Sequence, residues 1–188
     1  YVSGVTGKGS TGADGSFQCK TGDVMTFTLG GMNLGSAVCS TAITPLTLSL
    51  ASQIKDDRVV NRLLALQLLD EDQDPANGIQ LNSSVKTALA TQTLDFSASA
   101  SNFNTAMNAV LAKLPAPYQS RSADTQHRSL AREHFEDTLA SRLNAPVVET
   151  VTQTNRLGSI SAAITRYRVA AANSFYVSYE GSLAAVRA

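Results

Sequence analysis

Residues 12–31 read GADGSFQCKTGDVMTFTLGG and combine two turn signals with apolar, β-favouring positions. The Asp-Gly pair at 14–15 predicts a tight turn, because glycine adopts positive φ angles at no steric cost. Thr-Gly-Asp at 21–23 predicts a second turn, with apolar residues on both sides of it. The stretch therefore predicts a small N-terminal β-module in which Phe17 and Cys19 lie on one strand and the residues after the second turn form another.

The strand pattern extends from Val2 to about Leu48, and Gly-Gly at 30–31 predicts a turn within it. Near Asp56 the period changes. Apolar residues between 59 and 69 predict a helix that is apolar around much of its circumference, with Asp56 or Asp57 as its N-cap. A helix with such a wide apolar face is expected to be buried from several sides.

Three more helices are predicted before residue 146. The first begins at Ser83 or Ser84 and ends near Ala90, and the second is capped by Ser99 or Ser101 and ends before Pro115. The third runs from Asp124 to about Leu143. Its apolar face is expected to hold Leu130, Phe135, Leu139 and Leu143, and its outer face Arg128, Arg132, Glu133, Glu136 and Asp137.

The last 40 or so residues are less uniform in pattern. Residues 147–154 alternate as a strand does, but they also fit the start of a helix. Residues 159–172 predict a helix, and the run Phe-Tyr-Val-Ser-Tyr at 175–179 predicts a strand.

The two cysteines, Cys19 and Cys39, both lie in sequence with a β pattern. Two thiols are too few for a metal site, and no histidine or further cysteine lies near them. A structural disulfide that closes the β-module is the favoured interpretation, and a redox or metal-binding thiol pair or two free buried thiols are the alternatives. A disulfide would place the protein outside the cytosol.

Together these patterns predict an α+β fold in which a small disulfide-tied N-terminal β-module packs on a bundle of four or five helices, with a C-terminal strand. Residues 1–50 are assigned to the β-module, 51–146 to a helical region and 147–188 to a mixed C-terminal segment. All three are expected to form one compact unit.

The composition bears on compartment and partners. Charged residues make up only 16% of the chain, against a usual value of about 25%. Neutral hydroxyl and amide side chains replace them, as is common in secreted and envelope proteins. The formal net charge is zero, which argues against a nucleic-acid partner. No apolar run reaches the roughly 18 residues of a membrane span.

The acidic stretch DEDQDPANGI at 70–79 suggests a cation site. Asp70, Asp72 and Asp74 are spaced so that a turning loop brings them to one side, and hard oxygen ligands suit Ca²⁺. The EF-hand pattern is incomplete, because Pro75 stands sixth and Leu81 stands twelfth. The alternative is a solvated loop that ends the preceding helix and needs no cofactor.

No catalytic motif accompanies these features. His127 and His134 are two helical turns apart, roughly 10 Å, which is too far to share one metal ion. Ser129 lies beside His127 and Glu133, but the nucleophile elbow Gly-x-Ser-x-Gly does not occur. The sequence therefore predicts partly exposed helix histidines and favours a protein without catalytic residues.

Residues 11–31, Thr-Pro-Leu at 44–46, the apolar helix and Asn-Gly-Ile at 77–79 occur in an order that resembles an N-terminal module of bacterial secreted proteins and lipoproteins. The resemblance covers about residues 2–143 and implies no catalytic residues. Residues 173–181, NSFYVSYEG, are similar to the opening of the esterase-like phytase domain, which can follow such a module.

These observations favour a non-catalytic, extracytoplasmic bacterial module for binding, adhesion or self-assembly, with an extracellular filament subunit as one form of it. The alternative is an accessory N-terminal domain of a secreted phytase-like esterase. Protein partners, including further copies of the chain, are expected at the terminal β-segments. Phe175, Val177 and Tyr179 are the candidate contact residues, because an exposed strand edge can accept a neighbour's strand.

Overall fold

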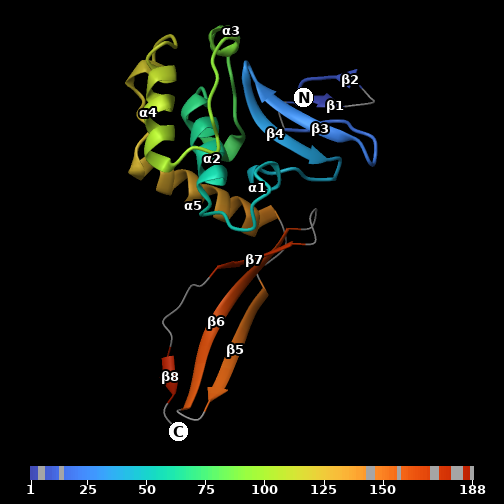
Figure 1. Cartoon of the computed structure of the whole chain (residues 1–188), viewed down its shortest axis with the longest axis vertical. Coiled ribbons are helices and arrows are strands. Elements are labelled where there is room, and N and C mark those ends of the chain that lie inside the picture. Colours follow the sequence, from blue (N-terminus) through green and yellow to red (C-terminus); the bar gives the residue numbers. More distant parts are fainter. Residues whose placement is uncertain are drawn as a thin grey trace. The chain divides into compact units, whose positions relative to one another are not determined.

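The structure is a computed structural model that describes residues 1–3, 7–12, 15–142, 147–155, 158–169, 174–178 and 184–186. It has the predicted α+β fold. The chain divides into two compact units, Tyr1–Phe135 and Glu136–Ala188. In chain order, the first unit contains β1 (Val2–Ser3), β2 (Gly7–Lys8), β3 (Val24–Leu29), β4 (Met32–Val38), α1 (Pro45–Leu48), α2 (Asp57–Leu69), the 3-10 helix η1 (Pro75–Asn77), α3 (Ser83–Leu89), α4 (Ala100–Leu111), the 3-10 helix η2 (Tyr118–Ser120) and the greater part of α5 (Thr125–Arg142) (Figure 1).

The N-terminal strands form an antiparallel sheet in the order β2-β1-β3-β4. The predicted turn at residues 30–31 joins β3 to β4. The prediction that Phe17 and Cys19 lie on a strand is wrong, because residues 16–20 have no ladder partner. Side chains hold this segment instead: the Phe17 ring contacts the rings of Tyr1 and Phe27. Asp14 of the first predicted turn lies outside the described residues.

The disulfide between Cys19 and Cys39 is confirmed, with their Cα atoms 5.9 Å apart. It ties the irregular segment before β3 to the end of β4. The Cys39 N–H also donates to the carbonyl of Asp23 over 2.8 Å. This bond and the disulfide hold together the end of the β3–β4 hairpin that lies opposite the turn at residues 30–31. Residues 45–48, where the strand pattern was expected to end, form α1 because Thr44 caps the helix and Pro45 fits its first turn.

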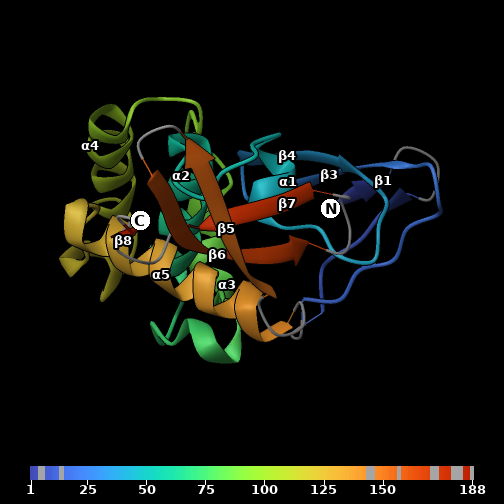
Figure 2. The ribbon, with the colours of Figure 1, turned by 90° about the horizontal axis from the view of Figure 1, so that it is seen from below.

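Helix α2 confirms the predicted buried helix, and Asp56 is its N-cap. Eight of its thirteen residues are buried, and α4 lies beside it in both Figure 1 and Figure 2. Around it gathers the main apolar core, which joins the sheet to the helices and includes Leu29, Met32, Leu64, Leu68, Leu69, Val85, Leu89, Phe96, Phe103, Met107, Leu111, Leu114 and Tyr118.

The turn between β3 and β4 packs directly on the end of α3. Gly30 has a φ of +59°, and a Cβ built there would lie 2.4 Å from the carbonyl oxygen of Leu89. The next residue, Gly31, donates its N–H to the same oxygen over 2.8 Å. Only glycine allows the two backbones to approach this closely, so the turn holds sheet and helices together.

The inner face of α5 differs from the prediction. Leu130 is 50% exposed, whereas Arg128 is only 9% exposed. The buried residues are Arg128, Ala131, Phe135 and Leu139, which follow one another at intervals of three and four and therefore share one face of the helix. Leu130 lies off that face, and Arg128 is buried because polar partners from two other helices surround it. Leu143 lies outside the described residues.

The second unit contains β5 (Val147–Asn155), β6 (Gly158–Val169), β7 (Ser174–Ser178) and β8 (Ala184–Val186). All three partners of β6 run antiparallel to it. The helix predicted over 159–172 is wrong as far as residue 169, because β6 pairs with β5 along nine consecutive residue pairs. Pairing with the preceding strand thus overrides the helical propensity of the alanine-rich segment. Residues 170–172 lie outside the described residues.

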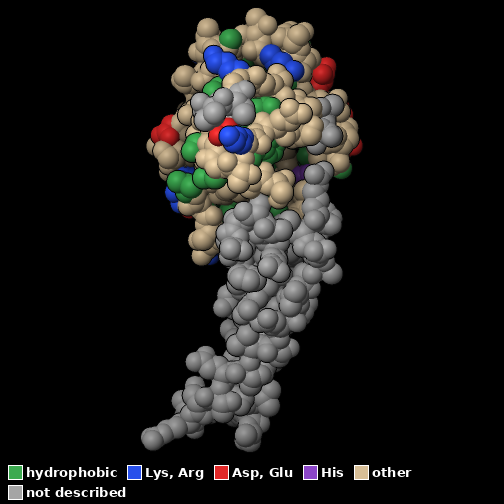
Figure 3. All heavy atoms as spheres, turned by 90° about the vertical axis from the view of Figure 1, so that its right-hand side faces the viewer, with side chains coloured by type: hydrophobic (Ala, Val, Ile, Leu, Met, Phe, Trp, Pro, Cys, Tyr) green, Lys and Arg blue, Asp and Glu red, His purple; other side chains and the backbone are tan. Residues whose placement is uncertain are grey.

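Charged side chains of both signs lie on the face of the molecule that Figure 3 shows. On the face in Figure 3, basic and acidic side chains of the described residues are interspersed among neutral ones. Among the helices that the structure describes, none combines the length and the apolar character that a membrane crossing requires.

Candidate functional site

The acidic loop that follows α2 is shaped by its own aspartates. Asp74 caps η1, since its carboxylate accepts the N–H of Ala76 over 3.1 Å. Asp72 accepts the N–H of Asp74 over 3.0 Å and the side-chain amide of Asn77 over 2.7 Å. The Asn77 bond is the largest cause of the lowered pKa of Asp72. Both exposed aspartates are therefore held in fixed positions within the loop.

Asp70 differs from them because it is fully buried, with 0% of its surface exposed. Its Oδ1 accepts the N–H of Gln80 over 2.7 Å. Its Oδ2 is buried and has no hydrogen-bond partner. Burial raises the pKa of Asp70, and the neighbouring Asp72 raises it further through its charge and through direct side-chain contact.

Arg121 closes the end of α2 beside this carboxylate. Its Nη1 donates to the carbonyl oxygens of Leu68, over 2.7 Å, and Asp70, and its Nη2 donates to that of Glu71 over 2.9 Å. The guanidinium lies over the ring of Tyr118, 4.1 Å from its centroid. These contacts satisfy carbonyls that a helix end leaves unpaired. They use the guanidinium on the backbone, and no ion pair forms between the described side chains of Arg121 and Asp70.

The predicted calcium ligands are thus only partly brought together. The charge of Asp72 contributes to the raised pKa of Asp70, whereas Asp74 uses its carboxylate as a helix cap. In the part of the chain that the structure describes, no group of three or more His, Cys, Asp or Glu side chains is arranged to hold a metal ion.

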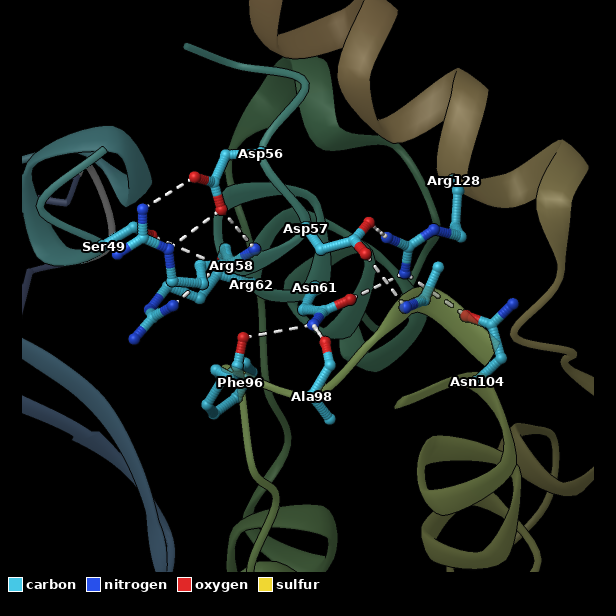
Figure 4. Close-up of polar contacts among 11 residues, drawn as sticks. Ser49, Asp56, Asp57, Arg58, Asn61, Arg62, Phe96, Ala98, Asn104 and Arg128 are labelled. Carbon is cyan, nitrogen blue, oxygen red and sulfur yellow. Dashed lines mark hydrogen bonds and ion pairs between the residues drawn. The ribbon is translucent and has the colours of Figure 1, made fainter. Parts of the chain in front are cut away.

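A second polar cluster, here called the Arg128 cluster, joins α2, α4 and α5 (Figure 4). Arg128 donates from Nη1 to Asn61 Oδ1 over 2.7 Å and to Asn104 Oδ1 over 3.3 Å, and from Nη2 to Asp57 Oδ1 over 2.8 Å. Asn61, which is fully buried, donates to the carbonyls of Phe96 and Ala98. Burial lowers the pKa of Arg128, and the charge of Asp57 opposes that effect.

On the other side of α2, Asp56 caps the helix and Arg62 joins it to the sheet (Figure 4). Asp56 accepts the backbone N–H and the guanidinium of Arg58, and that side-chain bond is the largest cause of its lowered pKa. Arg62 donates to the carbonyl of Leu34 on β4 and lies over the ring of Phe96. These contacts hold the sheet against α2.

Sequence reasoning missed these cationic positions. Arg128 was placed on a solvated face, and Arg62 and Arg121 carried no motif. One signal was present for the Arg128 cluster: Asn61 is the polar residue on the otherwise apolar face of α2 that carries Val60, Leu64, Ala65 and Leu68. A lone amide on a buried helix face requires hydrogen-bond partners, and so points to polar residues elsewhere in the chain.

The two histidines are partly exposed, as the sequence predicts. Both line an apolar hollow of about 290 Å³ between α2, the acidic loop and α5, together with Leu64, Gln67, Leu68, Gln73, Pro75 and Leu130. His127 Nδ1 lies 2.9 Å from Asp124 Oδ1, which also accepts the His127 N–H. Ser129 instead lines an open polar groove beside Arg128. His127 and Ser129 thus border different hollows and do not form a nucleophile–base pair.

The predicted partner-binding residues lie in the second unit. On β7, Phe175 is in register with Arg168 of β6, and Val177 is in register with Arg166. Tyr179 lies outside the described residues.

Comparison of the chain with protein-family models, with curated proteins and with solved structures found no match.

Proposed function

We propose that this chain is a non-catalytic, extracytoplasmic bacterial module that binds protein partners, including copies of itself, through the edges of its C-terminal sheet. The proposal includes adhesion and assembly into an extracellular filament. It also takes the chain to be related to the N-terminal modules of bacterial secreted proteins and lipoproteins whose motif order it resembles.

The extracytoplasmic location is supported by the disulfide between Cys19 and Cys39. Disulfides persist in oxidising compartments and are rare in the cytosol. The low content of charged residues, 16%, agrees with a secreted or cell-surface protein.

A binding role is supported by the use that the first unit makes of its polar side chains. Asn61 and Arg128 satisfy each other and the backbone within the fold. The carboxylate of Asp124 caps α5 and contacts His127. Groups that could act in acid–base chemistry thus have structural partners, so a surface is the better candidate for function.

The observation that carries the proposal is the edge of the second sheet. The order β5-β6-β7 gives β5 and β7 one strand neighbour each among the described residues. β5 is nine residues long and pairs along its length with β6, its one partner among the described residues. A strand edge presents N–H and C=O groups that a strand of another chain can pair with.

The test is the assembly state of the native chain, measured by size-exclusion chromatography with light scattering and by negative-stain microscopy. We expect dimers or larger assemblies for the wild type. The double variant Val151→Lys/Val177→Lys places charges on β5 and β7 and should shift the chain to monomers, because charged residues on edge strands oppose edge pairing.

Leu50→Lys is the matched control. Leu50 is 84% exposed and lies in the first unit. This variant therefore adds one lysine outside the C-terminal sheet, where the edge variant adds two within it, and it should assemble as the wild type does. A wild type that stays monomeric, or an edge variant that assembles like the control, would overturn the proposal. Hydrolysis of phosphate or carboxyl esters by the isolated chain would overturn its non-catalytic part.

A further inference from the structure

An open polar groove of about 470 Å³ lies beside Arg128, between the N-terminal parts of α2 and α4 and one face of α5. Four residues of α5 line it with the spacing of a single helix face: Thr125, Arg128, Ser129 and Arg132. Small-molecule sites commonly have volumes of about 300–1,000 Å³. The groove is thus large enough for a small ligand, and strand-edge binding makes no use of it.

The lining of the groove is positively charged. Lys55, Arg128 and Arg132 are basic, and Asp57 is the one acidic residue among the described residues that line it. Three positive charges against one negative charge leave an excess of two, although the net charge of the whole chain is zero. A concave site with an excess of one charge attracts ligands of the opposite charge. The groove is therefore suited to an anion.

Arg128 gives the groove a fixed cationic wall. It is only 9% exposed, and its guanidinium donates to Asn61, Asn104 and Asp57 (Figure 4). A guanidinium has five N–H donors, so these three bonds leave two of them for a ligand. The Asp57 carboxylate is occupied within the fold, because its second oxygen accepts the N–H of Ala100 over 3.1 Å.

Further donors around the groove are not engaged by the described part of the chain. Lys55 is exposed, and its ammonium group forms neither an ion pair nor a hydrogen bond there. The hydroxyl groups of Ser101, Thr125 and Ser129 likewise form no hydrogen bond with described residues. Arg132 already interacts with another residue. Lys55, the remaining N–H groups of Arg128 and the three hydroxyls are thus the donors assigned to the ligand.

A phosphate ester matches these donors better than a carboxylate does. It carries a charge of about −1.5 to −2 at neutral pH and three acceptor oxygens, whereas a carboxylate has one charge and two oxygens. Arginine and lysine both bind phosphate, arginine through parallel N–H bonds and lysine as a point charge. The first residues of α2, α4 and α5 also line the groove, and helix N-termini add to the attraction for an anion.

We propose that this groove binds a small phosphorylated molecule, with its phosphate group held by Lys55 and Arg128. The hydroxyls of Ser101, Thr125 and Ser129 bind the remaining phosphate oxygen and a polar organic part such as a sugar. The site binds without catalysing a reaction, and it is independent of the strand-edge function proposed above.

The test uses the full chain at low ionic strength, where salt screens exposed charges least. Glucose 6-phosphate and inorganic phosphate are titrated in by calorimetry, and the melting temperature is followed as their concentration rises. We expect both to bind and to raise the melting temperature by mass action. Glucuronate, a similar sugar with a carboxylate, should bind more weakly, and glucose should not bind. The absence of heat and of a thermal shift with both phosphates, or glucuronate binding as tightly as glucose 6-phosphate, would overturn the proposal.

Lys55→Gln should weaken the binding of glucose 6-phosphate by about tenfold, because it removes a charge-assisted contact. Lys86→Gln is the matched control, since Lys86 is an exposed lysine of α3 that does not line the groove. Both lysines are exposed, so both variants are expected to fold, and neither should change the assembly state, since both lie in the first unit. Equal affinities of the two variants for glucose 6-phosphate would overturn the assignment of the groove.

Discussion

Arg128 and Asn61 are joined by a hydrogen bond of 2.7 Å between Nη1 and Oδ1, although they are 67 residues apart in the sequence. The Asn61 amide group also donates to two backbone carbonyls in the segment before α4, so it joins that segment to α2 and α5. One buried pair thus fixes three helices relative to one another.

Asn61→Ala should lower the free energy of unfolding by about 3 kcal/mol, because it leaves buried carbonyls and one guanidinium N–H without partners. Asn102→Ala is the control. Asn102 is exposed on α4, and its removal should change stability by less than about 0.5 kcal/mol. Urea denaturation of both variants gives the comparison, and equal midpoints would contradict the role assigned to the cluster.

The turn that packs on α3 gives a second prediction. Gly30→Ala should cost about 2–4 kcal/mol, because a Cβ would collide with the Leu89 carbonyl and the φ of +59° is unfavourable for alanine. Gly22→Ala has a similar φ problem, +93°, but nothing lies within 4 Å of its Cβ. It should cost only about 1–2 kcal/mol. A Gly22 variant that is the less stable of the two in thermal denaturation would contradict the argument.

Local patterns were sufficient for much of the first unit. The period of α2, its cap at Asp56 and the turn at residues 30–31 follow from residues close in sequence, and all three occur as predicted. β6 could not be predicted in this way, because its strand conformation depends on pairing with β5 and not on its own propensity.

In the candidate site, too, features set by neighbouring residues could be predicted, and features set by distant residues could not. The acidic loop was visible in the sequence, but the burial of Asp70 was not. The guanidinium that covers this end of α2 comes from Arg121, 51 residues further on. Likewise, a charged residue on an amphipathic helix is normally assigned to solvent, and only the distant partner Asn61 makes Arg128 a buried one.

The disulfide gives a third prediction. Changing both Cys19 and Cys39 to serine should lower the free energy of unfolding by about 3 kcal/mol, the value expected for closure of a loop of this length. Mass analysis of the native, non-reduced chain should show two hydrogens fewer than the dithiol. Alkylation of both thiols in native protein would contradict the bond and weaken the extracytoplasmic assignment.

The last prediction concerns the pH dependence of stability. Burial raises the pKa of Asp70 in the folded state above its unfolded value of about 3.9. The folded chain therefore binds this proton more tightly, and Asp70 lowers the free energy of unfolding as the pH rises from the unfolded value through the folded one. Asp70→Asn cannot titrate, so this loss should disappear from the variant.

Asp95→Asn should have the opposite effect on the same profile. Hydrogen bonds from the Ser97 hydroxyl and N–H lower the pKa of Asp95, so its contribution is present above the unfolded value and is lost as the pH falls through the folded one. The measurement is the melting temperature of each variant minus that of the wild type, between about pH 3 and 7. This difference should rise with pH for Asp70→Asn and fall with pH for Asp95→Asn. If Asp70→Asn followed the wild type across this range, its carboxyl would titrate alike in the folded and unfolded chain, contrary to its burial beside Asp72.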